Sequence, residues 1–144
     1  MTTKIRDLLD FEGTWTLERM IQDRLTGTDS TLTGTAKLSR GKDGALDYAE
    51  EGELKVPDQP PLTASRKYQW SRKNGGQVAV DFEDGAPFHS FSLNRTMPEA
   101  THMCPPDMYH VTYDFSRWPI WSVEWRVQGP RKSYRLRSEY TRQR

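Results

Sequence analysis

Hydrophobic and polar residues alternate along most of the chain. Near the start, apolar residues recur at odd positions (Phe11, Trp15, Leu17 and Ile21), and the even positions are mostly polar. A period of two places successive side chains on opposite faces of a β-strand. Residues able to form turns interrupt the alternation about every 8–12 residues. This pattern predicts an all-β chain.

The alternation predicts about nine short strands joined by turns. Prolines between 57 and 61 cannot donate to a strand ladder, and "KNGG" supplies residues that accept a positive φ in a hairpin turn. We expect a longer loop over 94–106 and a short helix over 3–11, with its apolar residues on one side. The predicted strands cover 11–22, 31–39, 45–56, 62–70, 77–82, 88–93, 107–115, 120–128 and 133–142.

A sheet of this many strands must protect the unpaired backbone groups of its two edge strands. An isolated open sheet would expose two edges and pack only one face. Closure into an up-and-down antiparallel barrel of about 8–9 strands removes the edges and encloses one interior. A two-sheet sandwich is the alternative. We therefore expect a single all-β domain over residues 1–144, a closed barrel with a short N-terminal helix.

Three charged residues share a strand face with apolar residues. Parity places Arg19, Glu50 and Arg66 on the inward faces of the first, third and fourth strands. An unpaired charge inside a barrel costs several kcal/mol. The three charges therefore either form a hydrated ion-pair network at the barrel mouth or line a polar pocket. In the second case, Arg19 and Arg66 would recognise a carboxylate, phosphate or carbonyl.

The stretch "HMCPPDMYH" holds two of the three histidines and the only cysteine. Parity places Asp107 and Tyr109 on the more apolar, inward face of a strand and His110 outside. His102 and Cys104 are two positions apart, so they share a direction beside the entrance of this strand. We interpret the stretch as the rim of a pocket.

Three further residues belong to the candidate site. Trp125 and Tyr134 are inward-facing aromatic residues of the last two strands. His89 alternates with Phe91, but it also follows Phe88, so its direction stays open.

Metal binding and nucleophilic catalysis are two further hypotheses. His89, His102, Cys104 and Asp107 include donor types that suit zinc, but their spacing matches no standard zinc site. A nucleophilic Cys104 with His102 as its base needs a lowered thiol pKa and a third, orienting group. A hydrogen-bonded loop that closes the barrel explains each residue on its own, so we predict no metal and no cofactor.

Composition restricts the partners and the location. The chain has 21 basic and 20 acidic residues, a balance that argues against a broad nucleic-acid-binding surface. No apolar run approaches the roughly 20 residues of a membrane span, and the start lacks a signal peptide's apolar stretch. A single cysteine fits a reducing compartment. We expect a cytoplasmic monomer or homodimer that binds neither nucleic acid nor membrane.

The opening "FEGTWTL" is similar to the Gly-x-Trp signature of the calycin barrels, the lipocalins and their relatives. Gly13 and Trp15 match that signature. The resemblance implies a lipocalin-like barrel in which the tryptophan closes the base and packs against an arginine of the final strand. Arg142 and Arg137 are the two candidates for this cation–π partner.

A longer pattern resembles a family of small bacterial and fungal proteins known only as a domain of unknown function with a lipocalin-like barrel. It comprises "DGAPFH", "HMCPPDMY", a tryptophan, "WRVQGPRKSY" and a final "YTR", and covers residues 8–142. Ser133 departs from the pattern, which has an acidic residue after the lysine. The resemblance implies a fold but no activity. The matching residues are His89, His102, Cys104, Asp107, Tyr109, Trp125, Gly129, Pro130, Lys132 and Tyr134.

These observations favour a protein that binds a small polar or aromatic molecule inside the barrel. The alternative is an enzyme of the hydrolase or isomerase type, with His89 or His102 as general base and Asp107 as its orienting partner. A haem-binding barrel would need an axial histidine, which the last two strands lack. RNA binding through the basic C-terminal strand is less favoured, because alternating arginines are typical of a solvated outer face.

Overall fold

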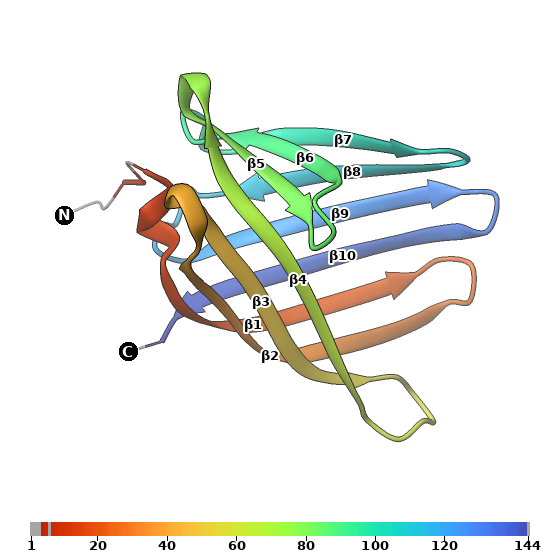
Figure 1. The fold of residues 1–144 in the computed structure, drawn as a ribbon. Coiled ribbons are helices and arrows are strands. Elements are labelled where there is room, and N and C mark those ends of the chain that lie inside the picture. Colours follow the sequence, from red (N-terminus) through yellow and green to blue (C-terminus); the bar gives the residue numbers. More distant parts are fainter. Residues whose placement is uncertain (1–3, 6, 144) are drawn as a thin grey trace.

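The computed structural model describes residues 4–5 and 7–143, which form one antiparallel sheet curled into a nearly closed barrel (Figure 1). The predicted all-β barrel is confirmed. No helix in the described part of the chain is long and apolar enough to cross a bilayer. The elements are η1 (Leu8–Phe11), β1 (Gly13–Asp23), β2 (Thr28–Arg40), η2 (Lys42–Gly44), β3 (Leu46–Lys55), β4 (Leu62–Lys73), η3 (Asn74–Gly76), β5 (Gln77–Phe82), β6 (Pro87–Ser92), β7 (Glu99–Cys104), β8 (Asp107–Asp114), β9 (Trp121–Gly129) and β10 (Lys132–Arg142).

The strands follow an up-and-down order, β6-β5-β4-β3-β2-β1-β10-β9-β8-β7. The ladder between β1 and β10 joins the two ends of the chain, from Trp15 opposite Arg142 to Asp23 opposite Tyr134. Between residues 7 and 143, no ladder joins β6 to β7, so these two are the edge strands. Side chains cross this seam, and the rings of Phe88 and His102 have centroids 5.2 Å apart.

The sheet has ten strands, one more than the alternation predicts. The additional strand, β7, lies within the segment 94–106 where we expected a loop. Its sequence has no apolar alternation, but its backbone pairs with β8, with Thr101 opposite His110 and Met103 opposite Met108. An edge strand gains its order from one neighbour and needs no continuous apolar face. Periodicity therefore could not reveal it.

The N-terminal helix is shorter than we expected over 3–11. It is a single 3-10 turn, η1, and residues 3 and 6 of the predicted range lie outside the described residues. Leu8 and Phe11 of this turn are fully buried. The turn thus caps the end of the barrel at which both chain termini lie (Figure 1).

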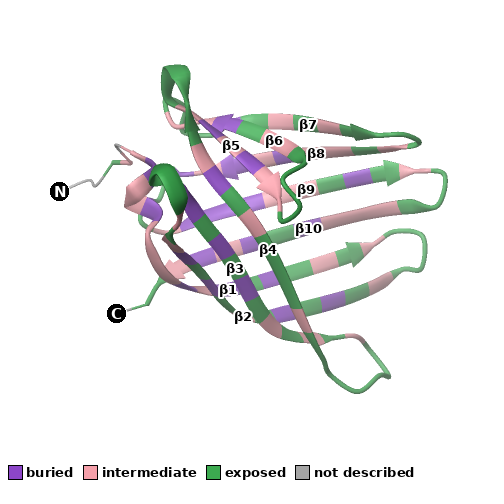
Figure 2. Ribbon diagram, viewed as in Figure 1, coloured by how far each residue is buried: buried purple, intermediate pink, exposed green. Residues whose placement is uncertain are grey.

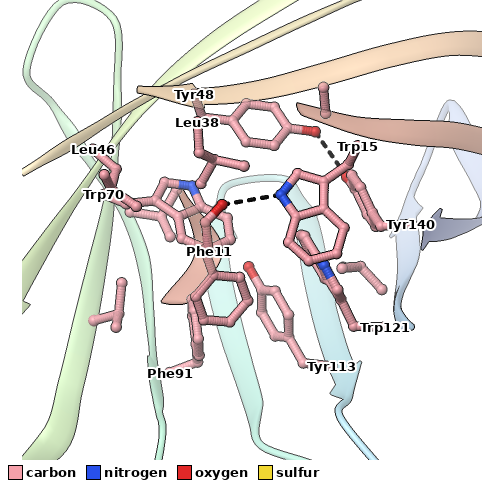
Figure 3. Packing of buried hydrophobic residues seen from close by; sticks show 14 of the residues in the cluster. Phe11, Trp15, Leu38, Leu46, Tyr48, Trp70, Phe91, Tyr113, Trp121 and Tyr140 are labelled. Atoms are coloured by element: carbon pink, nitrogen blue, oxygen red, sulfur yellow. Dashed lines mark hydrogen bonds between the residues drawn. The ribbon is translucent and has the colours of Figure 1, made fainter. Parts of the chain in front are cut away.

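The hydrophobic core is concentrated at this capped end, which we call the closed end (Figures 2 and 3). The Phe11 ring packs edge-to-face against Trp70, Trp118 and Trp121, with centroids 4.8–5.4 Å apart. The indole Nε1 of Trp15 donates to the backbone oxygen of Phe11 at 3.0 Å. Aromatic rings bury large areas and favour such edge-to-face contacts, so few residues build this core.

Arg142 seals the closed end from outside. Its guanidinium carbon lies 4.2 Å from the Trp15 ring centroid. Its Nη1 and Nη2 donate to the backbone oxygens of Glu12 and Asp10 at 2.9 and 2.7 Å. Gly13 has φ +137°, and a Cβ there would meet Nη1 of Arg142 at 3.1 Å. The cation–π partner expected for Trp15 is therefore Arg142 rather than Arg137.

We predict that Arg142→Lys lowers the free energy of unfolding by about 1–3 kcal/mol, because an ammonium group cannot combine ring stacking with two diverging hydrogen bonds. Urea denaturation measures this change. Arg137→Lys is the matched control, since Arg137 is exposed like Arg142 but forms no cation–π contact or hydrogen bond with a described residue, and it should change stability by less than about 0.5 kcal/mol. Equal effects of the two substitutions would refute the assignment.

Candidate functional site

An ion pair between Arg19 and Glu50 lies inside the barrel. Only 8% of Arg19 and 5% of Glu50 is exposed. Nη1 and Nη2 of Arg19 donate to the two carboxylate oxygens of Glu50 at 2.7 and 2.9 Å, and Nε donates to Ser138 Oγ at 2.7 Å. This bidentate pair neutralises both charges within the barrel and connects β1, β3 and β10.

Two tyrosine hydroxyls extend this pair into a network. Tyr48 donates to Glu50 Oε1 at 2.7 Å, and the Tyr140 hydroxyl lies 2.8 Å from that of Tyr48. Burial would raise the pKa of Glu50, but the hydrogen bonds and charge of Arg19 outweigh it and hold this pKa below its ordinary value. Burial raises the pKa of Tyr140 to about 12. At neutral pH the acid is ionised and the phenols are neutral.

A narrow pocket lies beside the network, with a volume of about 50 Å³. This volume has room for a few waters or for the polar end of a small molecule. Five of the predicted site residues line it: Arg19, Glu50, Arg66, His89 and Trp125. Its other lining side chains are mostly aromatic: Tyr48, Tyr68, Trp70, Phe88, Tyr113, Trp121 and Tyr140.

Arg66 differs from the other two charged residues of the pocket. It projects from β4 and is exposed, and it makes no hydrogen bond or ion pair with any described residue. Arg66 lies opposite Glu50 in the β3–β4 ladder, and its charge acts on the Glu50 carboxylate. Both Glu50 oxygens are bound by Arg19, however, so the Arg66 guanidinium forms no ion pair of its own with a described residue.

A β-bulge in β6 turns two consecutive residues toward the pocket. Val80 pairs with His89, but Asp81 pairs with Pro87, so Phe88 is an additional residue in β6. Phe88 and His89 both line the pocket. The Phe88 ring is parallel to that of Trp125, with centroids 4.9 Å apart. The bulge settles the direction of His89 that parity leaves open.

His89 lies half-buried beside Tyr113, with its Nε2 2.7 Å from the Tyr113 hydroxyl. Burial, with a smaller contribution from His102, lowers the pKa of His89 to about 3. The imidazole is therefore neutral at physiological pH. Two buried side-chain atoms among the described residues have no hydrogen-bond partner, His89 Nδ1 and Trp121 Nε1. Both belong to residues that line the pocket.

Asp107, Tyr109 and Tyr134 lie beyond the pocket lining, at a rim cluster that also contains Lys132. Lys132 Nζ lies 3.3 Å from Asp107 Oδ2 and donates to the Tyr109 hydroxyl at 3.1 Å. Tyr134 adjoins this cluster: burial, with smaller contributions from Tyr109, raises the pKa of its phenol. Lys132 thus pairs across the sheet with Asp107 and does not need an acidic residue at position 133. A Cβ on Gly129 would lie 2.0 Å from Asp107 Oδ1, so the cluster requires a glycine there.

His102 and Cys104 do not line the pocket themselves. His102 contacts the rings of Phe88 and Tyr109, at centroid distances of 5.2 and 5.9 Å, and Cys104 is exposed. His110 faces outward as predicted. In the part of the chain that the structure describes, no three His, Cys, Asp or Glu side chains gather as metal ligands, and neither His89 nor His102 forms a hydrogen bond with Asp107.

Sequence reasoning missed several pocket residues for different reasons. Strand parity turns Tyr48, Tyr113, Trp121 and Ser138 inward. The partners of Tyr48, Tyr113 and Ser138 lie on other strands, and no sequence pattern shows that Trp121 Nε1 has no partner among the described residues. Phe88 has no such signal, because only the bulge turns it inward.

We predict that Glu50→Gln lowers the free energy of unfolding by about 3–5 kcal/mol, because it leaves the buried charge of Arg19 uncompensated. Arg19→Met combined with Glu50→Gln should cost less than the sum of the two single changes. A double-mutant cycle from urea denaturation measures this coupling. Additive losses would show that the pair does not hold the interior.

We predict that stability decreases as the pH falls from about 6.5 toward 3, the ordinary and the folded-state pKa of His89. In this window the unfolded chain binds a proton that folded His89 excludes, so acid favours unfolding, with a limiting slope of about 1.4 kcal/mol per pH unit. Urea midpoints at several pH values measure it. His89→Gln should reduce the slope and His110→Gln should not. Retention of the full slope by His89→Gln would contradict the prediction.

A model of the family of unknown function DUF6314 matches residues 11–142. The structure of the S-type phycobiliprotein lyase CPES from Guillardia theta has a TM-score of 0.68 to this one, at 7% sequence identity, and the match covers 92% of this chain and 88% of that chain. No curated protein matches in sequence.

At 7% identity, the structural likeness shows a shared fold and no more. The expected membership of a family of unknown function is confirmed, while the bacterial and fungal source and the lipocalin relationship stay predictions. Since the family model extends over nearly the whole sequence, the chain belongs to the DUF6314 family of unknown function.

Proposed function

We propose that this barrel binds a small polar or aromatic molecule, with the polar end of the molecule inside the pocket. The observation that supports this proposal is the pair of buried, unpartnered atoms, His89 Nδ1 and Trp121 Nε1, in residues of the pocket lining. Buried polar groups in native proteins nearly always have partners, and an unpaired one costs about 1–3 kcal/mol. A bound molecule that pairs with them would recover this free energy.

The aromatic lining suits the remainder of such a molecule. Tyr68, Phe88 and Trp125 line the pocket as half-buried rings, and the pocket volume of about 50 Å³ accommodates only a small part of a ligand. The body of the ligand would therefore pack against these rings. A fold shared with a phycobiliprotein lyase is compatible with a small-molecule ligand. We also propose a cytoplasmic location, since the one cysteine can form no internal disulfide.

The geometry favours binding over the alternative of a hydrolase or isomerase. A histidine with a pKa of about 3 is a weak general base at neutral pH. Asp107, the expected orienting residue, pairs with Lys132 instead. Cys104 is exposed, and its thiol makes no hydrogen bond with a histidine of the described residues. The His–Asp pair that the enzyme hypothesis requires does not form between described residues.

We predict that, among the tryptophans, only those that line the pocket contact a ligand. In protein labelled with ¹⁵N at tryptophan, aromatic fragments of mixed charge should shift the indole signals of Trp70, Trp121 and Trp125, which line the pocket. The signals of Trp15 and Trp118, buried at the closed end, should move least. Nuclear magnetic resonance titration measures the shifts. Equal shifts of all five signals would indicate nonspecific association.

A variant with a filled pocket tests the same proposal. Val123→Phe adds a ring to the lining and should weaken fragment binding at least about tenfold, while circular dichroism and cooperative unfolding report that the barrel remains folded. Met20→Phe, on an exposed position of β1, is the matched control and should bind like the unmodified protein. Unchanged fragment binding by folded Val123→Phe would reject the pocket as the binding site.

A further inference from the structure

The polar groups that the pocket leaves unpaired have one chemical character. The Nε1 of Trp121 is buried without a partner, and an indole nitrogen can only donate a hydrogen bond. The group therefore needs an acceptor, which no described residue supplies.

His89 adds a second donor. If the Tyr113 hydroxyl donates to Nε2, then the ring proton lies on Nδ1, and one donor is unpaired. If Nε2 instead donates to Tyr113, then Nδ1 is an unpaired acceptor and the tyrosine proton is unpaired as well. A neutral imidazole bears one ring proton, and leaving a buried group unpaired costs free energy. The first arrangement leaves fewer unpaired groups, so Nδ1 bears the proton and is a donor.

The carboxylate that lines the pocket and two of its hydroxyl oxygens are, by contrast, already in use. The Glu50 carboxylate accepts from Arg19 and Tyr48, and Ser138 Oγ accepts from Arg19. Because Tyr48 donates to Glu50, its own oxygen accepts from Tyr140. The network is therefore complete without a ligand, and it offers no carboxylate to a cationic molecule.

Arg66 supplies an unpaired positive charge at the same pocket. Guanidinium groups bind carboxylates through two parallel hydrogen bonds. An unpaired arginine beside two unpaired donors and a set of aromatic rings is complementary to an acceptor-rich anion with a planar body.

We propose that the ligand of this pocket is an aromatic carboxylate, held by the Arg66 guanidinium and by the unpaired N–H groups of His89 and Trp121. This inference rests on the proposed function and specifies its ligand class. The carboxylate enters the pocket, whose volume of about 50 Å³ fits a polar group, and the ring packs against Phe88 and Trp125.

Three planar fragments of nearly the same shape test the ligand class. Benzoate is an anion that only accepts hydrogen bonds, benzamide is neutral and does both, and benzamidine is a cation that only donates. Titration of the ¹⁵N-tryptophan signals should give a dissociation constant for benzoate at least about tenfold lower than that for benzamide, with no saturable shift for benzamidine.

Variants of the protein test the donors. Arg66→Gln should raise the benzoate dissociation constant about tenfold and leave that of benzamide nearly unchanged, because it removes a charge from an exposed side chain without breaking an ion pair. Trp121→Phe retains a ring without the donor and should weaken benzoate binding several-fold. Arg131→Gln, at an exposed arginine of the β9–β10 turn, is the matched control and should have no effect.

The outcomes separate this inference from the proposed function. If all three fragments bind the pocket equally, or if benzamidine binds best, the anion class is wrong and small-molecule binding stands. If benzoate binds best but Arg66→Gln does not weaken it, the assigned recognition by Arg66 is wrong. If no fragment produces a saturable shift of a pocket tryptophan, both proposals are overturned.

Discussion

The buried ion pair of Arg19 and Glu50 is the interaction on which the interior of this barrel depends. A charge removed from water is tolerated only with a close partner and further hydrogen bonds. Here Arg19 and Glu50 neutralise each other. Ser138 accepts a further hydrogen bond from Arg19, and Tyr48 donates one to the Glu50 carboxylate. The pair links β1, β3 and β10 across the barrel. Because Arg19 and Glu50 pair with each other, Arg66 is the charged residue of the pocket that forms no ion pair with a described residue.

The two ends of the barrel are built differently, and this difference creates the pocket. At the closed end, η1 and a cluster of tryptophans leave little space, and Arg142 covers Trp15 with its guanidinium plane. Along one side of the barrel, no ladder between described residues joins β6 to β7, and aromatic side chains such as Phe88 fill the seam. Close packing therefore gives way to half-buried rings, against which the body of a bound molecule can pack.

Much of the architecture follows from the period of two along the sequence. Alternation identified nine of the ten strands, the inward direction of Arg19, Glu50 and Arg66, and the outward direction of His110. The Gly-x-Trp signature led to the contact between Trp15 and Arg142. These features are local or repeat regularly, so a pattern in the sequence records them.

The sequence by itself determined the fold class and the direction of most residues in the regular strands, because strand parity depends only on spacing along one chain. Tertiary structure alone decided that Arg19 is paired and Arg66 is not, since partners on different strands meet only through the register of the closed sheet. Tertiary structure also decided that β7 forms as a strand and that a bulge turns Phe88 and His89 inward together. Both depend on hydrogen bonds to a neighbouring strand, which no pattern within a single strand encodes.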